Sequence, residues 1–177
     1  MAPRLRKLVL CTHVTSTVGW LGAVVVFLVL AAIGLTSQDA QMVRGVYLVM
    51  EPAAWLVLVP LSLASLLTGL VQSLGTVWGL FRHYWVLFKL LITVVATIVL
   101  LTYMETFRAM ATVAADPGAD PDAIRNPSPL LHATLALLAL LVATVLAVYK
   151  PRGMTRYGRR QAAFATAESL ADHRPGC

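Results

Sequence analysis

Three histidines and one lysine lie within or beside long apolar stretches, where ionisable side chains are rare: His13, His83, Lys89 and His132. Placing a charged side chain at the centre of a membrane costs roughly 2.5–3.5 kcal/mol, so such residues are candidate functional residues by default. Neutral imidazole ligates haem iron and copper, and a lysine can hold a haem propionate or a substrate carboxylate. The structural alternatives are a lysine stem that reaches the membrane interface and histidines that only hydrogen-bond inside a core.

Methionine supplies a second set of candidate ligands. Met50 and Met104 fall near the ends of apolar runs on the same side as His132. Thioether sulfur and imidazole together form a soft ligand set that suits Cu(I), although methionine also packs against lipid and neighbouring helices. The sequence carries no phosphate-binding loop, nucleophile elbow, CxxC or HExxH pattern. It therefore gives no support to the chemistry of soluble enzymes and assigns no enzymatic activity.

Four apolar runs contain these residues, and each is long enough to cross a bilayer, which takes about 20 residues. The 177-residue chain is 59% apolar and 12% charged, whereas soluble chains are about half apolar and a quarter charged. The predicted fold class is all-α, a polytopic integral membrane four-helix bundle over residues 1–150, followed by a basic tail over 151–177. The predicted spans are Leu8–Ile33, Val46–Val71, Tyr84–Phe107 and Leu130–Tyr149.

Each predicted span has one face of small or polar residues, which is typical of helix–helix contacts in membranes. We expect all four faces to point inward. In chain order they contain His13, Thr17, Trp20 and Val24; Glu51, Trp55, Ser62, Ser65 and Gly69; Lys89, Thr93, Ala96, Leu100 and Tyr103; and His132, Ala136, Ala139 and Ala143.

Depth along the helices separates the ionisable residues into two layers. With a rise of about 1.5 Å per residue, His13 and Lys89 lie at one level, close to the helix boundary at His83. His132 enters from the opposite side of the membrane. The two levels are more than about 12 Å apart, so His13 and His132 are not expected to ligate the same iron. Within the second span, Pro60 lacks a backbone donor and predicts a kink.

The distribution of Lys and Arg predicts the orientation. Nine of these residues flank the spans on the side of both termini and three on the other side, and the positive-inside rule then places both termini in the cytoplasm. We expect a multi-pass protein of the cytoplasmic membrane, the inner membrane of a bacterial cell. Anionic lipid accounts for the basic charge, so nucleic acid is not an expected partner. Other membrane subunits or a second copy of the chain are open alternatives.

The first and third spans resemble known bacterial membrane families. His13 followed by Trp20-Leu21-Gly22 resembles the first helix of the copper-resistance D (CopD) and HemJ families, the latter being membrane protoporphyrinogen oxidases. Trp85 followed by Lys89-Leu90 resembles the start of the matching HemJ helix. The stretch 60–101 looks most like an uncharacterised family of four-helix membrane proteins that is distantly related to both.

The resemblance implies haem b as prosthetic group, with His13 and Lys89 matching the histidine and lysine that HemJ proteins need. Where HemJ proteins carry a Pro-Arg stretch, this chain has Ala31-Ala32-Ile33-Gly34, so the resemblance extends to haem binding more than to porphyrinogen oxidation. We expect a redox or electron-transfer membrane protein with a cofactor near His13, Lys89, Trp20 and His83. The alternatives are a copper-handling protein that uses His13, His132, Met50 and Met104, and a structural or accessory subunit without cofactor.

Overall fold

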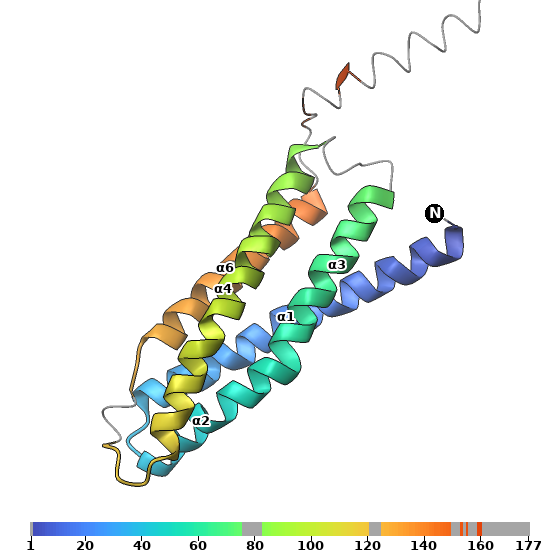
Figure 1. Ribbon diagram of the computed structural model, residues 1–177. Helices are drawn as coiled ribbons and strands as arrows, with labels where there is room; N and C mark the ends of the chain where they lie inside the picture. Colours follow the sequence, from blue (N-terminus) through green and yellow to red (C-terminus); the bar gives the residue numbers. More distant parts are fainter. Residues whose placement is uncertain are drawn as a thin grey trace, which may run out of the picture.

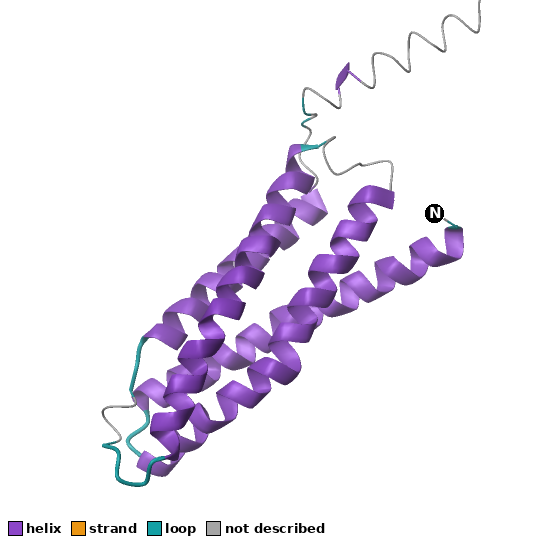
Figure 2. Ribbon diagram, viewed as in Figure 1, coloured by secondary structure: helices purple, strands orange, loops and turns teal. Residues whose placement is uncertain are grey.

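The computed structural model describes residues 2–75, 83–120, 125–149, 153, 155 and 159–160. Within this part the chain is almost entirely helical (Figures 1 and 2). The predicted tail over 151–177 lies outside the described residues apart from 153, 155 and 159–160. The helical elements are α1 (Pro3–Thr36), α2 (Ala40–Ala53), the π-helical segment η1 (Ala54–Leu58), α3 (Val59–Gly75), α4 (Tyr84–Ala115) and α6 (Ser128–Tyr149).

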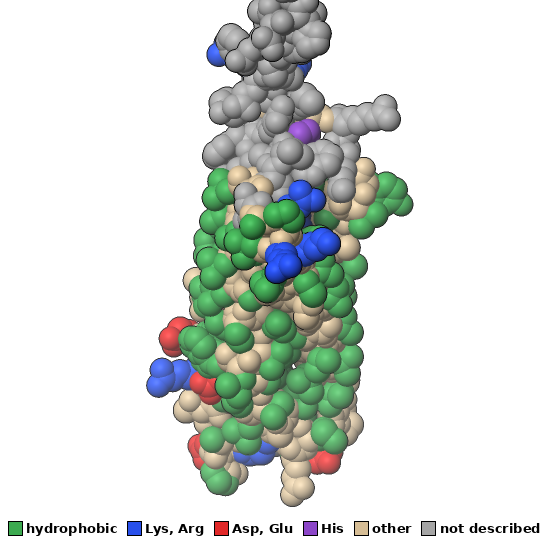
Figure 3. All heavy atoms as spheres, turned by 90° about the vertical axis from the view of Figure 1, so that its right-hand side faces the viewer, with side chains coloured by type: hydrophobic (Ala, Val, Ile, Leu, Met, Phe, Trp, Pro, Cys, Tyr) green, Lys and Arg blue, Asp and Glu red, His purple; other side chains and the backbone are tan. Residues whose placement is uncertain are grey.

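Four helical stretches are long and apolar enough to cross a membrane, which confirms the all-α four-helix prediction. α2, η1 and α3 together form one such stretch, Ala40–Gly75, and α1, α4 and α6 are the other three. The four predicted spans fall inside them. Hydrophobic side chains cover most of the face seen in Figure 3, and its few charged side chains lie in the upper part, at the left edge and at the lower end. This distribution is that of a multi-pass membrane protein.

The four stretches form a ring in which neighbours are antiparallel. α1 packs against α2–α3 and α6, and α4 packs against the same two neighbours from the other side. α1 and α4 therefore lie across the bundle from each other. The start of α1 and the end of α6 lie at the same end of the bundle (Figure 1).

The inward faces predicted for the first, third and fourth spans are confirmed. Trp20 and Val24 on α1, Tyr103 on α4 and Ala143 on α6 are all buried, and the other predicted members of these faces are buried or half-buried. The helical period alone sets these faces, because α1, α4 and α6 each run without interruption.

The face predicted for the second span is wrong at Trp55, which is 53% exposed. Ser62 and Ser65 are buried and Glu51 and Gly69 are half-buried, but the most deeply buried residues before Ser62 include Met50 and Ala54. The π-helical turn explains the difference, since it places one more residue in its turn than an α-helix does. Residues before the turn are thereby shifted by one position, so that Met50 replaces Glu51 on the inward face.

The π-helical segment lies just before Pro60, where the sequence predicted a kink. The N–H of Val59 donates to the carbonyl oxygen of Ala54 across the π-turn. Pro52, within α2, is a second residue of this span that lacks a backbone donor. The distortion therefore occupies the segment between Pro52 and Pro60, and it ends where α3 begins at Val59, one residue before the second proline.

Aromatic residues pack in the core at the end of the bundle that contains α2. The rings of Phe27 and Phe107 meet edge to face at 5.7 Å, and those of Tyr103 and Phe107 at 4.9 Å. Gly34 allows the ring of Tyr47 to approach α1, because a Cβ there would lie 3.2 Å from ring carbons. The Phe27–Phe107 contact joins α1 to α4 without polar groups, and Tyr103 supports the Phe107 ring from within α4.

Arg44 anchors the segment that follows α4. Its guanidinium donates hydrogen bonds to the carbonyl oxygens of Ala114, Asp116, Pro117 and Ala119. A planar cation with several donors is suited to bind several carbonyl groups at once. The described beginning of this connection is therefore fixed to α2.

Candidate functional site

His13 lies at the centre of a polar cluster near one end of the bundle. Its side chain is 8% exposed, and its Nδ1 lies 3.1 Å from the carbonyl oxygen of Ser65 and 3.0 Å from Oγ1 of Thr68. A carbonyl oxygen only accepts hydrogen bonds, so Nδ1 carries the proton in the neutral ring and Nε2 carries a lone pair. The imidazole is thus held in the tautomer that presents Nε2 as an acceptor or ligand.

Contacts with residues of α1 and α3 fix the position of His13. Thr17 donates from Oγ1 to the carbonyl oxygen of His13 at 2.7 Å, and the same Oγ1 lies 2.9 Å from Oγ of Ser65. On the α3 side, a Cβ added to Gly69 would lie 3.1 Å from Cε1 of His13. The ring therefore occupies a space that exists because residue 69 has no side chain.

Lys89 reaches His13 from the opposite helix. Nζ of Lys89 lies 3.1 Å from Nε2 of His13, and the ammonium is the donor because Nε2 has the lone pair. The side chain thus turns into the bundle instead of extending to the membrane interface. Among the described residues, the Lys89 ammonium therefore pairs with the neutral imidazole of His13 and not with a carboxylate.

The two other residues predicted near this site lie elsewhere. His83 precedes the first residue of α4, and its ring faces Trp85 at 6.5 Å between centroids. Trp20 is buried on the same face of α1 as His13, about 10 Å farther along the helix. The structure therefore joins His13 to Lys89 and places Trp20 toward the middle of the bundle.

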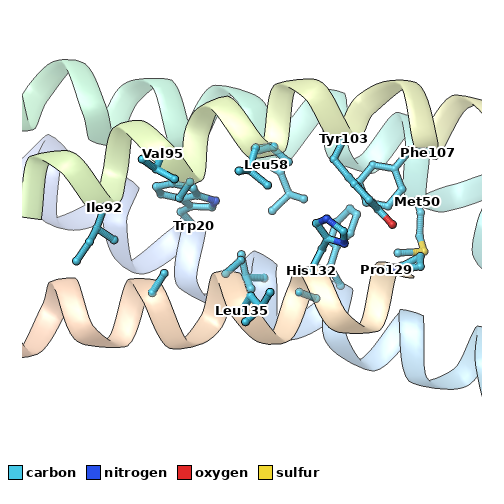
Figure 4. A pocket seen from close by; sticks show the side chains of 18 of the residues that line it. Trp20, Met50, Leu58, Ile92, Val95, Tyr103, Phe107, Pro129, His132 and Leu135 are labelled. Atoms are coloured by element: carbon cyan, nitrogen blue, oxygen red, sulfur yellow. The ribbon is translucent and has the colours of Figure 1, made fainter. Parts of the chain in front are cut away.

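A cavity of about 590 Å³ opens next to Trp20 between α1, α4 and α6 (Figure 4). Its walls are apolar except for His132 and Tyr103 at one end and the indole N–H of Trp20 toward the other. Three of its lining residues, Leu91, Val95 and Leu135, are at least 50% exposed. The cavity therefore communicates with the lipid-facing surface of α4 and α6.

His132 is held by its own helix and by α4. Its Nδ1 lies 2.9 Å from the carbonyl oxygen of Ser128, so this ring too has its proton on Nδ1 and its lone pair on Nε2. The ring stacks on Tyr103 at 4.2 Å between centroids. The hydroxyl of Tyr103 donates to Oγ of Ser128 at 2.8 Å, which ties the three residues into one unit.

The two histidines belong to separate sites. His13 contacts Lys89 and His132 contacts Tyr103, two α4 residues about 21 Å apart along the helix. This distance agrees with the predicted separation into two layers.

The donors predicted for copper are only partly brought together. Met50 and His132 line the same cavity, whereas Met104 is 3% exposed within the core cluster. The described residues contain no group of three His, Cys, Asp or Glu side chains that could hold a metal ion. The cavity therefore offers two of the four donors predicted for a copper ion, and His13 is not one of them.

Several partners of the site residues were not predicted. Thr68 contacts His13 and lies between Ser65 and Gly69, two residues of the predicted inward face. Its place beside Gly69 could have identified it as a residue that faces the bundle interior. Tyr103 was placed on the correct face, but its stacking on His132 depends on how α4 and α6 pack.

Comparison of the chain with known family models, with curated proteins and with solved structures finds no match.

Proposed function

We propose that this multi-pass membrane protein binds an anionic redox cofactor at the His13–Lys89 pair and belongs functionally to the redox or electron-transfer membrane proteins. The observation that carries the proposal is the 3.1 Å approach of Lys89 Nζ to His13 Nε2. A buried cation is expensive in a membrane and is normally paired with an anion. Here its described partner is neutral, which leaves the positive charge available to an anionic ligand.

The donor chemistry of the pair fits haem b, the cofactor that the sequence resemblance implies. A histidine ligand of haem iron uses one ring nitrogen while the other donates to a carbonyl group, as Nδ1 of His13 does to Ser65. The lone pair of Nε2 accepts from Lys89 in this structure. Ligation therefore requires the ammonium to leave Nε2, and a haem propionate is an anion that would attract it.

The residues of the chain have distinct parts in this proposal. His13 would ligate the iron, Lys89 would hold a propionate, and Ser65 and Thr68 would keep the imidazole in the required tautomer. Haem b, when bound, supplies one-electron redox chemistry. The apolar helices around the site exclude water and so strengthen the attraction between Lys89 and an anion.

The test is the absorption spectrum and haem content of the full chain, purified in detergent from cells supplied with a haem precursor. We expect a Soret band in the wild type, its loss in His13→Ala and a strongly reduced haem content in Lys89→Met. Lys7→Met removes an exposed lysine from the same end of the bundle and should leave the spectrum unchanged. His132→Ala should also retain the spectrum. His83→Ala should at most shift the Soret band without abolishing it.

Three results would contradict the proposal. A wild-type protein without haem but with copper, which His132→Ala then loses, would establish the copper-handling alternative. A wild-type protein that contains neither haem nor copper would favour the third alternative, a structural subunit without cofactor. A Soret band that survives His13→Ala but disappears in His132→Ala would place the cofactor in the cavity.

A further inference from the structure

The cavity between α1, α4 and α6 has the properties of a binding site for a small apolar molecule. Its volume of about 590 Å³ is in the ordinary range for ligand pockets, roughly 300–1,000 Å³. Its opening toward Leu91, Val95 and Leu135 gives a ligand access from the lipid phase. Any molecule that enters this way must itself be soluble in the membrane.

Four aromatic side chains contribute to the cavity wall. Tyr103 and Phe107 lie at its polar end, and Trp20 lies toward the other end (Figure 4). Phe27 contacts the ring of Phe107. Aromatic rings bind one another in edge-to-face and offset arrangements better than they bind flexible chains of similar area. The aromatic end of the cavity therefore favours an aromatic ring over a lipid acyl chain, while the aliphatic remainder suits an apolar substituent.

His132 determines which polar group such a ligand needs. Its Nδ1–H is used by the carbonyl oxygen of Ser128, and the described residues record no partner for Nε2. The hydroxyl of Tyr103 is also engaged as a donor, toward Ser128. The polar end of the cavity therefore presents a hydrogen-bond acceptor, and an acceptor left unpaired in an apolar cavity costs free energy.

From these contacts we infer that the cavity binds a lipid-soluble phenol or hydroquinone whose hydroxyl group donates a hydrogen bond to Nε2 of His132. The aromatic ring of the ligand lies against the cavity-facing side of the Phe27, Tyr103 and Phe107 cluster, whose rings contact one another. Its apolar substituent extends toward Trp20 and the opening between α4 and α6. A quinone in its oxidised form has only acceptors on its ring and cannot donate a hydrogen bond to Nε2 of His132. This site is separate from the His13–Lys89 pair and does not depend on a cofactor there.

The test uses an alkylphenol with a photoreactive diazirine on its alkyl chain and, as a matched probe, the methyl ether of the same molecule. Both are crosslinked to the full chain in lipid nanodiscs, and the labelled peptides are mapped by mass spectrometry. We expect labelling of cavity-lining residues on α4 and α6. The phenol should half-saturate at a concentration about fivefold lower than the ether, which is the effect of one hydrogen bond.

Variants at position 132 assign the difference to the imidazole. His132→Leu should abolish the preference for the phenol over the ether, whereas His132→Gln should keep most of it, because the amide oxygen of Gln is an acceptor near the position of Nε2. Thr134→Val, on the exposed face of α6, is the control and should leave the preference unchanged. His13→Ala should also leave it unchanged, which keeps this test independent of the proposed cofactor site.

Two outcomes would overturn the inference. Equal labelling by phenol and ether in the wild type would show that the cavity is only a groove for lipid chains, and this comparison needs no variant that might misfold. A preference for the phenol that persists in His132→Leu would show that another group recognises the hydroxyl.

Discussion

Nζ of Lys89 and Nε2 of His13 lie 3.1 Å apart, although 76 residues separate them in the chain and their helices stand across the bundle from each other. The long side chain of Lys89 reaches across the bundle, and glycine at residue 69 lets the His13 ring that it meets lie against α3. Toward the other end, the space between α1, α4 and α6 widens into the apolar cavity. The bundle thus has a polar half and an aromatic half.

Replacement of Gly69 by alanine should disturb the polar half. The new Cβ would lie 3.1 Å from Cε1 of His13, which is closer than ordinary van der Waals contact, so the ring must move. Gly22→Ala is the matched control, because a Cβ at that position meets nothing within 4 Å. We expect Gly22→Ala to be neutral or to stabilise the helix by up to about 1 kcal/mol, and Gly69→Ala to be less stable than Gly22→Ala in thermal unfolding in detergent. Equal stabilisation by both would contradict the close packing of His13.

The two tryptophans predicted on inward faces should respond differently to truncation. Trp20 is 2% exposed and Trp55 is 53% exposed. Truncation of a buried tryptophan costs roughly 3–5 kcal/mol, whereas a change on the outer surface usually stays within about 0.5 kcal/mol. We expect Trp20→Ala to lower resistance to unfolding by SDS strongly and Trp55→Ala to leave it nearly unchanged. The reverse order would show that the π-helical segment does not rotate Trp55 outward.

Loss of the Arg44 guanidinium should release the segment after α4. Four carbonyl oxygens over residues 114–119 accept hydrogen bonds from it. In Arg44→Met we expect the amides of residues 116 and 118–120 to exchange with deuterium about tenfold faster, which corresponds to the loss of one charge-assisted hydrogen bond. Arg108→Met removes an exposed arginine from the end of α4 and is the control. Unchanged exchange in Arg44→Met would mean that this segment is held by other contacts.

Orientation in the membrane is predicted by the nine-to-three asymmetry of Lys and Arg. In a background of Cys11→Ser and Cys177→Ser, a membrane-impermeant maleimide added to intact cells should label Pro117→Cys and spare Ala2→Cys. Both positions are exposed in the structure, so access to the thiol reports only the side of the membrane. Labelling of Ala2→Cys alone would reverse the orientation.

The amino-acid pattern was sufficient to predict the number of spans and three of the four inward faces. Membrane spans can be predicted because the length of an apolar run is a local property, and the bilayer thickness sets the length that a span requires. The faces of α1, α4 and α6 follow from the helical period, and the common level of His13 and Lys89 follows from the rise per residue. All of these properties can be computed along one helix without knowledge of its neighbours.

The remaining features depend on how the helices pack. Met50 replaces Glu51 on the inward face because a π-turn shifts the register of α2. Pro60 predicted a distortion in this span, but not its form or its effect on the register. The partners of His13 on α3, the stacking of Tyr103 on His132 and the cavity beside them depend on the rotation and separation of neighbouring helices. Lipid and core are equally apolar, so hydrophobicity does not specify which apolar surfaces of two membrane helices meet. Close packing of small residues and a few polar contacts decide it, and both arise only in the folded bundle.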